Sequence, residues 1–367
     1  MEVSSLIREQ LESIKPYIPG KPIEEVKREL GLDEVIKLAS NENPFGPGKK
    51  AVEAIKKGAK KVSIYPDGNV HQLRRKLADK LSVKEDNLLF GNGSDEILVM
   101  LGQAFLEADD EIIMAETTFS EYEFSANIMG AEVKKVPLNN YRHDLEAMAE
   151  KVSDKTKIVF VCNPNNPTGT IVTKKEVDDF LAKIPDDVLV VFDEAYQEFV
   201  TSDEYPDSLE YLNKRKNIII LRTFSKAYGL SGLRIGYAIA DSELIGYLDR
   251  VRQPFNVNKI AQEAALAALD DNEHIEKTLA NNKQQKEYLI KEFAKLGLEY
   301  VPTQANFILV EVERDADQLF EQLLRQGVII RSMSSYDYQT KIRVTIGLEE
   351  ENKKFIKEFK QVLSSEK

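Results

Sequence analysis

A lysine surrounded by small and polar residues could form a covalent bond with a carbonyl compound. Lys226 lies in the segment Thr-Phe-Ser-Lys-Ala-Tyr-Gly-Leu-Ser-Gly-Leu-Arg, residues 223–234. A lysine amine forms Schiff bases with carbonyl groups, and the neighbouring glycines allow the backbone to approach a ligand closely. Arg234 is near enough in sequence to bind an anionic group of the same ligand. A solvated surface lysine is the alternative interpretation, and this segment alone does not choose between the two.

An apolar run ends just before this segment and indicates the element that positions the lysine. Residues 218–221 are Ile-Ile-Ile-Leu, which is typical of a buried strand. Open α/β sheets bind their ligands beyond the carboxyl ends of their strands. We therefore expect Lys226 to lie at the carboxyl edge of a sheet.

Strand-like segments alternate with helical patterns through the middle of the chain. This alternation predicts an α/β fold, with a mostly parallel sheet covered by helices. Right-handed crossovers should bring the loops that follow the parallel strands to one edge of that sheet. The expected strands cover residues 88–90, 111–114, 132–136, 157–162, 188–192, 217–221 and 236–240.

The loop after the first expected strand has the pattern of an anion site. Gly93, Ser94 and Asp95 follow the strand and precede an apolar helical run. The free N–H groups and the dipole at a helix start both favour an anion there, although Ser94 or Asp95 could simply cap the helix. Glu96 stands where a dinucleotide-binding motif has its third glycine, and no Gly-Lys-Ser/Thr follows, so neither of those phosphate motifs is expected.

Loops further along the same edge carry side chains that suit a hydroxylated heterocycle. Asp193 ends an apolar segment and could keep a ring nitrogen protonated, although an aspartate at a strand end is more often a helix cap. Tyr196 and Asn166 could bond an oxygen on the ring, and Phe119 could either lie flat on the ring or pack in the core. Donors for one phosphate are available from Gly93, Ser94, Asp95, Ser225 and Arg234. Together with a reactive lysine, these residues describe a site for pyridoxal phosphate.

The overall composition argues against several other classes of function. The 367 residues include 62 acidic and 50 basic side chains, a formal net charge of −12, which argues against a nucleic-acid partner. One cysteine, Cys162, excludes an intramolecular disulfide framework, and the three histidines lack the spacing of a metal site. No apolar stretch approaches the roughly 18 residues of a membrane span, and the first residues do not resemble a signal peptide. We therefore expect a cytoplasmic protein without a metal centre.

The chain is long for one hydrophobic core, so a large and a small domain are expected. Residues 259–297 have the composition of a long helix broken near 270–272, which could bridge the two. We expect the large domain at 41–264 and the small domain at 1–40 together with 265–367. The small domain has an α+β pattern, with strand-like pieces at 307–310, 328–331 and 341–346 and helices at 315–326 and 349–364.

The loop at residues 38–47, Leu-Ala-Ser-Asn-Glu-Asn-Pro-Phe-Gly-Pro, is rich in turn-forming residues. Its asparagine side chains can bond the nearby backbone. Two interpretations stay open: the loop either connects two elements or forms the rim of a pocket.

Over essentially its whole length the chain resembles the histidinol-phosphate aminotransferase family, within the class II, fold-type I pyridoxal-phosphate-dependent aminotransferases. The resemblance rests on seven motifs in the family's order: Asn-Glu-Asn-Pro at 41–44, Tyr-Pro-Asp-Gly at 65–68, Gly-Asn-Gly-Ser-Asp at 91–95, the loop 163–169, Asp-Glu-Ala-Tyr at 193–196, the Lys226 segment, and Ile-Arg-Val-Thr-Ile-Gly at 342–347. It implies a large domain with a mostly parallel seven-stranded sheet, a smaller α+β domain, and a homodimer with shared active sites.

The resemblance also implies a role for each residue of the cofactor site. Lys226 would bind pyridoxal phosphate as a Schiff base and then act as general acid and base, while Asp193 would pair with the ring nitrogen. Tyr196 and Asn166 would bind the ring oxygen, and Phe119 would stack on the ring. The phosphate would be bound by Gly93, Ser94, Asp95, Ser225 and Arg234, and by Tyr65 of the second subunit.

Further residues would bind the substrates, which are small amino and oxo acids. Arg343 would bind the carboxylate of glutamate bidentately, a geometry that lysine cannot reproduce. Arg331, with Tyr17 and Asn43, would contact the rest of the other substrate, including a phosphate group.

The implied reaction is transamination between L-histidinol phosphate and 2-oxoglutarate, giving imidazole-acetol phosphate and L-glutamate in histidine biosynthesis. Two departures from the family's pattern bear on specificity. Thr117 stands where relatives usually have proline, and residues 332–340 contain two tyrosines and lack the usual glycine. The alternatives are an aromatic amino-acid aminotransferase, an enzyme resembling threonine-phosphate decarboxylase, and a non-catalytic binding protein of the same architecture.

Overall fold

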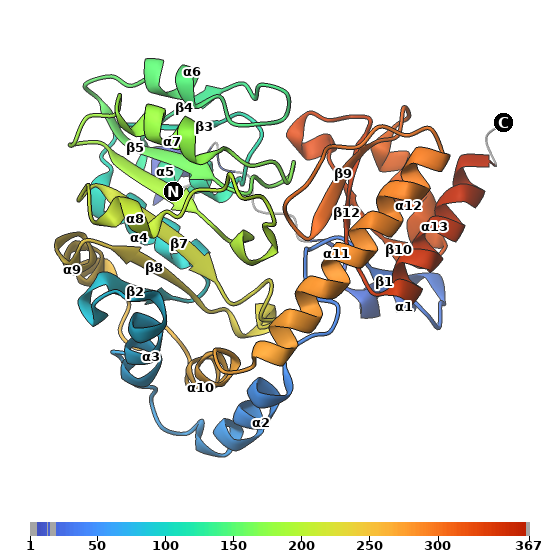
Figure 1. The fold of residues 1–367 in the computed structure, drawn as a ribbon, viewed down its shortest axis with the longest axis horizontal. Helices are drawn as coiled ribbons and strands as arrows, with labels where there is room; N and C mark the ends of the chain where they lie inside the picture. Colours follow the sequence, from blue (N-terminus) through green and yellow to red (C-terminus); the bar gives the residue numbers. More distant parts are fainter. Residues whose placement is uncertain (1–5, 13, 15–19, 365–367) are drawn as a thin grey trace.

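The largest of the three sheets in the described part of the chain lies between two layers of helices (Figure 1). The computed structural model describes residues 6–12, 14 and 20–364. Seven strands form this sheet in the order β2-β8-β7-β6-β5-β3-β4, which confirms the expected mostly parallel α/β architecture. Strands β4, β3, β5, β6 and β7 are parallel, while β8 is antiparallel to both β7 and β2. The strands are β2 (Leu88–Gly91), β3 (Glu111–Ala115), β4 (Glu132–Val136), β5 (Thr156–Cys162), β6 (Leu189–Asp193), β7 (Ile218–Thr223) and β8 (Gly236–Ala240).

The sheet strands form where the chain has short runs of apolar, mostly β-branched residues. Every residue of β6 and of β7 is buried, because a parallel strand with helices on both faces needs no polar side. Strand β4 lies at the edge and instead places the charged side chains of Glu132, Lys134 and Lys135 at the surface. Charges on an edge strand discourage pairing with another chain.

The helices of the large sheet fall into two groups by the core that they complete. Apolar residues of α2, α3, α6, α7, α8 and α10 pack on one face of the sheet, and those of α4, α5 and α9 pack on the other. These helices are α2 (Lys49–Gly58), α3 (His71–Leu81), α4 (Ser94–Phe105), α5 (Glu121–Met129), α6 (Leu145–Glu150), α7 (Lys174–Leu181), α8 (Leu209–Leu212), α9 (Ser242–Val251) and α10 (Lys259–Ala268).

A second hydrophobic core lies at the other end of the molecule, around a three-stranded antiparallel sheet of order β11-β12-β9 (Figure 1). A short parallel pair of β1 with β10 joins the N-terminal segment to this C-terminal part. The elements here are α1 (Ile23–Leu30), β1 (Ile36–Lys37), β9 (Phe307–Glu311), α12 (Ala316–Arg325), β10 (Val328–Ile329), β11 (Arg331–Ser332), β12 (Lys341–Thr345) and α13 (Glu349–Ser364).

The single strand expected at 328–331 is divided between two sheets, which corrects that part of the sequence prediction. Residues 328–329 pair with residues 36–37, whereas Arg331 pairs with Arg343. The change of partner at Ile330 follows from the N-terminal segment, which takes up the backbone groups of β10 and leaves only β11 to extend the three-stranded sheet. A continuous apolar run gives no sign of such a change.

Helix α11 (Asn272–Lys295) runs from the large sheet to the second core (Figure 1). The long helix expected at 259–297 is thus broken between α10 and α11, near the predicted position. The expected domain boundaries, with a large domain at 41–264 and a small domain formed by the two flanking segments, stay a prediction. Because Ala265, Ala268 and Leu269 are buried in the core of the large sheet, we propose that the junction lies after α10 rather than within it.

Candidate active site

Adjacent parallel strands bring three of the expected site loops together. In the register of the sheet, Cys162 at the end of β5 lies opposite Asp193 of β6, and Asp193 lies opposite Leu221 of β7. The loops that follow these strands carry Asn166, Tyr196 and Lys226. They therefore leave the sheet at one edge, as the sequence predicts.

Lys226 is partly buried and follows the end of β7 closely. Its Nζ donates a 3.2 Å hydrogen bond to the carbonyl of Ser40 and lies 5.6 Å from the centre of the Tyr196 ring. Desolvation, and secondarily the positive charge of Arg343, lower the pKa of Lys226 to about 8. Roughly a tenth of the amine is then uncharged at pH 7, far more than for an ordinary lysine, and the uncharged amine is the form that attacks a carbonyl.

Asp193 is a buried carboxylate held by two hydrogen bonds. It accepts a 2.6 Å bond from the hydroxyl of Tyr122 and a 3.1 Å bond from the backbone N–H of Ala195. Burial raises the pKa of Asp193 to about 6, while the bond from Tyr122 acts in the opposite direction. Within the described part of the chain no lysine or arginine forms an ion pair with this carboxylate. A cationic group next to such a buried carboxylate would favour its ionised form.

The start of α4 and the side chain of Arg234 form a compact group of anion-binding donors. Arg234 bonds Asp95 at 2.9 Å and the hydroxyl of Ser225 at 3.4 Å. Gly93 is the N-cap residue of α4 and has a φ of 82°. A Cβ at Gly93 would lie 2.4 Å from Nη2 of Arg234, so only glycine allows this approach. With Ser94 as the first residue of α4, the five residues that one subunit is expected to contribute to a phosphate site lie together.

Tyr196 and Asn166 each already have a side-chain partner. The hydroxyl of Tyr196 accepts a 3.0 Å hydrogen bond from Asn41, and burial raises the pKa of this tyrosine. The amide oxygen of Asn166 accepts a 2.5 Å bond from Arg343, which also donates to the carbonyl of Ala39. Arg343 thus connects the second core to the loop of Asn166.

Aromatic side chains order the loop after β3. Phe119 is partly buried and meets the ring of Tyr122 edge-on at 5.7 Å, while Tyr122 lies flat on Phe160 at 4.6 Å. Both interpretations of Phe119 therefore persist, because it packs against the core and is still partly exposed. The aromatic pairs fix the direction of the Tyr122 hydroxyl toward Asp193.

Of the four remaining sequence candidates, one is already hydrogen-bonded within the protein, one lies away from this cluster, one lies beside Arg343, and one cannot be placed. The amide of Asn43 donates to the carbonyl of Ala227 at 2.8 Å and to the hydroxyl of Thr278 at 3.0 Å, so both of its N–H groups are used within the protein. Tyr65 is 78% exposed and stacks on Phe255 rather than on any residue near Lys226. Arg331 lies beside Arg343, as described next, and Tyr17 lies outside the described residues.

Arg331 and Arg343 face each other across the β11–β12 pair. They are direct partners in the antiparallel register, and residues that oppose each other in this way have side chains on the same face. The described structure gives the Arg331 side chain no hydrogen bond or ion pair. Two like charges placed side by side repel each other unless an anion lies between them, so this pair is suited to an anionic substrate.

The sequence analysis missed two residues that support the site. Tyr122 lies in α5, where a tyrosine on an apolar helix face is indistinguishable from a core residue. Asn41 belongs to the turn-rich loop and to the motif at 41–44, but no role at the site was assigned to it. It bonds Tyr196 and has a φ of 56°, a conformation that asparagine tolerates. The buried ion pair of Arg222 with Glu194, at 2.8 Å, further ties the loop after β6 to β7.

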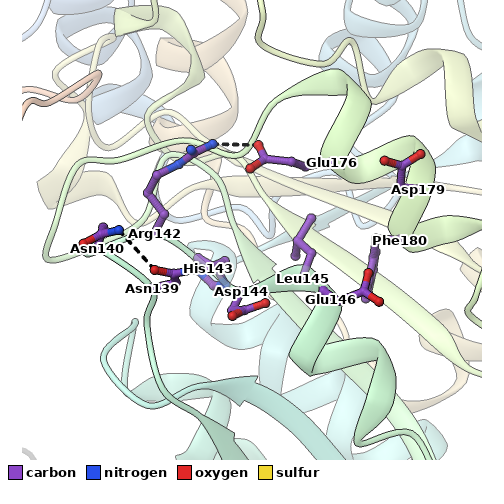
Figure 2. A pocket seen from close by; sticks show the side chains of 10 residues that line it. All are labelled: Asn139, Asn140, Arg142, His143, Asp144, Leu145, Glu146, Glu176, Asp179 and Phe180. Atoms are coloured by element: carbon purple, nitrogen blue, oxygen red, sulfur yellow. Dashed lines mark hydrogen bonds and ion pairs between the residues drawn. The ribbon is translucent and has the colours of Figure 1, made fainter.

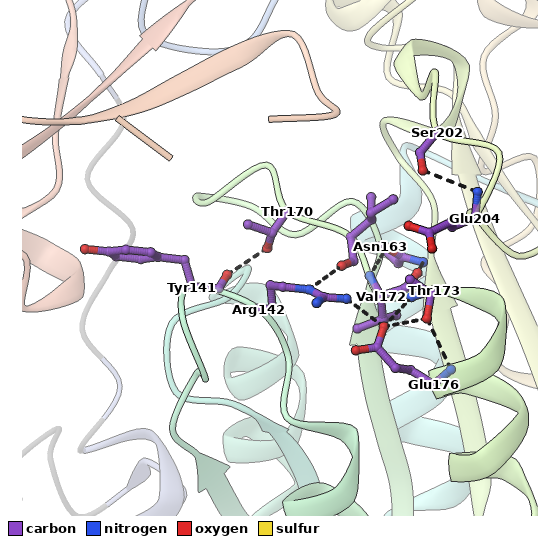
Figure 3. A network of polar contacts seen from close by, with 10 residues as sticks. Tyr141, Arg142, Asn163, Thr170, Val172, Thr173, Glu176, Ser202 and Glu204 are labelled. Carbon is purple, nitrogen blue, oxygen red and sulfur yellow. Dashed lines mark hydrogen bonds and ion pairs between the residues drawn. The ribbon is translucent and has the colours of Figure 1, made fainter. Parts of the chain in front are cut away.

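The loop that carries Asn166 is anchored to the large sheet by a polar network. Arg142 donates to the carbonyl of Ile171 and forms an ion pair with Glu176 at 2.6 Å (Figure 3). Glu176 also closes a capping box with Thr173 at the start of α7. A cavity of about 250 Å³ beside α6 and α7 lies next to this network (Figure 2). None of the expected cofactor residues lines that cavity.

The cluster fits pyridoxal phosphate on two observations. The space beside Gly93 would be filled by a Cβ and is bordered by the Arg234 guanidinium, which suits a phosphate. The buried carboxylate of Asp193 suits a protonated ring nitrogen, and Lys226 is within the same group of loops.

Among the described residues, no group of three or more histidine, cysteine, aspartate or glutamate side chains could hold a metal ion. The same residues include no helix that is long and apolar enough to cross a membrane.

Comparisons with known proteins agree with this geometry. Residues 33–359 match the family described as aminotransferase class I and II. A histidinol-phosphate aminotransferase of Moorella thermoacetica is 54% identical, covering 97% of this chain and 93% of that protein. One of Caldicellulosiruptor saccharolyticus is 50% identical, covering 98% and 100%. The crystal structure of the Sinorhizobium meliloti histidinol-phosphate aminotransferase with pyridoxal-5'-phosphate superimposes with a TM-score of 0.91 at 27% identity, over 99% of both chains. The chain therefore belongs to the class I and II aminotransferases, within the histidinol-phosphate aminotransferase family.

Proposed function

We propose that this chain transfers the amino group of L-histidinol phosphate to 2-oxoglutarate, giving imidazole-acetol phosphate and L-glutamate, a step of histidine biosynthesis. The observation that carries the proposal is the pair of arginines, Arg331 and Arg343, on one face of the β11–β12 ribbon next to the Lys226 cluster. One substrate of this reaction carries a phosphate and the other carries two carboxylates. The site therefore needs one cation for a phosphate and one for a carboxylate, and the two arginines supply them.

Lys226 and Asp193 are the residues to which we assign the chemistry. When bound, pyridoxal phosphate supplies an aldehyde for covalent capture of amino groups and a ring that accepts electrons. Nζ of Lys226 would hold the cofactor, and once displaced by the substrate amine it would take the proton from the substrate carbon that bears the amino group. The carboxylate of Asp193 would hold the proton on the ring nitrogen, and the bond from Tyr122 keeps this carboxylate ionised more readily.

The remaining residues of the cluster would bind and orient the ligands. Tyr196 and Asn166 would donate to an oxygen on the cofactor ring, and Phe119 would cover one face of the ring. Arg343 would bind the carboxylate of glutamate with two parallel hydrogen bonds. Arg331, whose side chain has no partner in the described structure, would bind the phosphate of histidinol phosphate. The phosphate of the cofactor would be bound by Gly93, Ser94, Asp95, Ser225 and Arg234.

We also propose a homodimer in which Tyr65 completes the partner's cofactor site. Val62, Ile64 and Tyr65 are each more than 60% exposed, and Tyr65 stacks on Phe255, itself 46% exposed. An apolar and aromatic surface of this kind is typical of an interface. Sedimentation analysis should give twice the monomer mass, whereas a monomer at micromolar concentration would contradict this proposal. A cytoplasmic location also stays a prediction.

A comparison of amino donors tests the proposed reaction. We expect the value of kcat/KM for L-histidinol phosphate, with 2-oxoglutarate as acceptor, to exceed that for L-phenylalanine or L-aspartate by at least about 100-fold, since charge-assisted phosphate contacts contribute roughly 1.5–3 kcal/mol each. A higher value for phenylalanine would instead favour an aromatic amino-acid aminotransferase. Release of carbon dioxide without an acceptor would favour a decarboxylase.

A further inference from the structure

A strained turn projects a tyrosine from the large domain. Asn139 and Arg142 exchange two backbone hydrogen bonds of 2.9 and 3.0 Å around the central residues Asn140 and Tyr141, whose φ values are 49° and 64°. Two positive φ values are the pattern of a type I′ turn, which asparagine tolerates but a bulky tyrosine does not. Backbone strain of this kind persists where the surrounding contacts require a particular side chain at that place.

The side chain of Tyr141 meets the small domain. Its ring lies edge-on to that of Tyr338, with the ring centres 6.2 Å apart. Nζ of Lys341 lies 5.9 Å from the centre of the Tyr141 ring and 5.2 Å from that of Tyr338. A cation shared between two aromatic rings adds attraction to their contact, and Lys341 also forms an ion pair with Glu311.

Tyr338 reaches a second loop of the large domain. Burial raises the pKa of Tyr338, and a hydrogen bond with the side chain of Thr117 acts in the opposite direction. The carbonyl of Thr117 accepts a 3.1 Å bond from the amide of Asn165. Thr117 precedes Phe119 by two residues, and Asn165 adjoins Asn166. The two sequence departures from the family's pattern, Thr117 and the segment 332–340, therefore contact each other beside the cofactor loops.

On the small-domain side, Tyr338 and Lys341 lie in the same loop and strand as the two arginines, Arg331 and Arg343. Lys341 and Arg343 are two residues apart in β12, so their side chains lie on one face of the strand. The segment 332–340 joins β11, which carries Arg331, to β12, and it is closed by backbone bonds from Met333 N to Lys341 O at 3.1 Å and from Lys341 N to Tyr338 O at 3.2 Å. A shift of Tyr338 would therefore move both arginines.

We propose that Tyr141, Tyr338 and Lys341 form an interdomain latch that positions Arg331 and Arg343 against the cofactor loops. The proposal rests on the proposed function and adds that substrate affinity depends on the population in which this latch is closed. The three are positioning residues, since none of them touches the reacting atoms. The Thr117–Tyr338 contact belongs to the same latch.

Variants of the two tyrosines in the holoenzyme test the latch. Tyr141→Gly relieves the strained backbone, so its melting temperature should equal or exceed that of the wild type. Tyr141→Gly and Tyr338→Ala should each raise KM for both substrates about threefold to tenfold and leave kcat within about twofold, because only the population of the closed state changes. The double variant should resemble Tyr338→Ala, since that substitution already removes the contact between the two rings together with the contact to Thr117. The matched control is Tyr247→Ala, which removes an exposed tyrosine of α9 and should leave both constants unchanged.

Unchanged KM values in both single variants would overturn the latch, and so would effects that simply multiply in the double variant. This result is distinguishable from failure of the proposed function. If the wild type does not use histidinol phosphate, the same ratios are measured with L-glutamate as the donor and whichever oxo acid it accepts, and the latch predicts the same pattern.

Discussion

The hydroxyl of Tyr122 donates a 2.6 Å hydrogen bond to Oδ2 of Asp193, from a position 71 residues earlier in the chain. Both side chains are buried, and the flat stacking of Tyr122 on Phe160 fixes the direction of the bond. Tyr122 thereby favours the ionised form of a carboxylate that burial would otherwise keep protonated. This contact sets the pH below which the site should lose activity.

Tyr122→Phe should narrow the active pH range from the acid side. Loss of the hydrogen bond raises the pKa of Asp193 further above its present value of about 6, and the ionised carboxylate is the active form, so the acid limb of kcat/KM moves to higher pH. We expect the loss to grow as the pH falls, up to about tenfold for a bond worth about 1.5 kcal/mol, with little loss at pH 8.5. Tyr211→Phe is the control, because it removes a similar bond to Asp178. An unshifted acid limb would contradict the assigned role of Asp193.

Gly93→Ala should damage cofactor binding specifically. A Cβ there would lie 2.4 Å from Nη2 of Arg234, on a backbone with a φ of 82°. We expect the Kd for pyridoxal phosphate to rise at least about tenfold, as measured by fluorescence titration of the apoenzyme. Gly246→Ala in α9, where a Cβ meets nothing within 4 Å, should leave that Kd unchanged and stabilise the protein by about 0.5–1 kcal/mol. If Gly93→Ala binds pyridoxal phosphate with the affinity of the wild type, the assignment of Arg234 to the phosphate site is wrong.

Arg331→Gln should reduce discrimination for the phosphate of the amino donor. The ratio of kcat/KM for histidinol phosphate to that for histidinol should fall about 10- to 100-fold, because one charge-assisted contact is lost. Kinetic constants for L-glutamate, bound by Arg343, should change less than about twofold. Arg325→Gln, an exposed arginine of α12, serves as the control. If the ratio stays constant, Arg331 does not bind the phosphate.

The pKa of Lys226 predicts how cofactor capture depends on pH. Because the uncharged amine attacks the aldehyde and the pKa of Lys226 is lowered to about 8, the rate of capture by the apoenzyme should rise with pH around a midpoint near 8. Arg343→Gln removes one of the causes of that lowering, so the midpoint should move to higher pH. Stopped-flow absorbance gives both curves, and coincident midpoints would show that the Arg343 charge has no influence on Lys226.

Much of the large domain could be predicted from the sequence because its strands are buried on both sides. A segment such as residues 218–221 has no polar positions and is too short for a helix, so strand position and approximate bounds follow directly. Asp193 and Lys226 were found for the same reason, since each lies at or just beyond the end of such a segment.

The contacts between distant segments could not be predicted. Tyr122 lies in a segment with a helical pattern, and nothing in that pattern indicates that its hydroxyl bonds a carboxylate at the end of a strand. The amide of Asn43 was expected to contact substrate, but its N–H groups bond Ala227 in the loop after β7 and Thr278 in α11. Both lie far from Asn43 in the sequence and are brought near it only by the folding of the chain. The pairing of Thr117 with Tyr338 likewise depends on the approach of the two domains.

Peptide mapping of the borohydride-reduced holoenzyme tests the central claim, that Lys226 carries the cofactor. Reduction fixes the cofactor on its lysine, and mass spectrometry identifies that residue. We predict a phosphopyridoxyl group on the peptide containing Lys226, and loss of this label together with nearly all turnover in Lys226→Ala. A label on another lysine, or normal transamination by Lys226→Ala, would contradict the account.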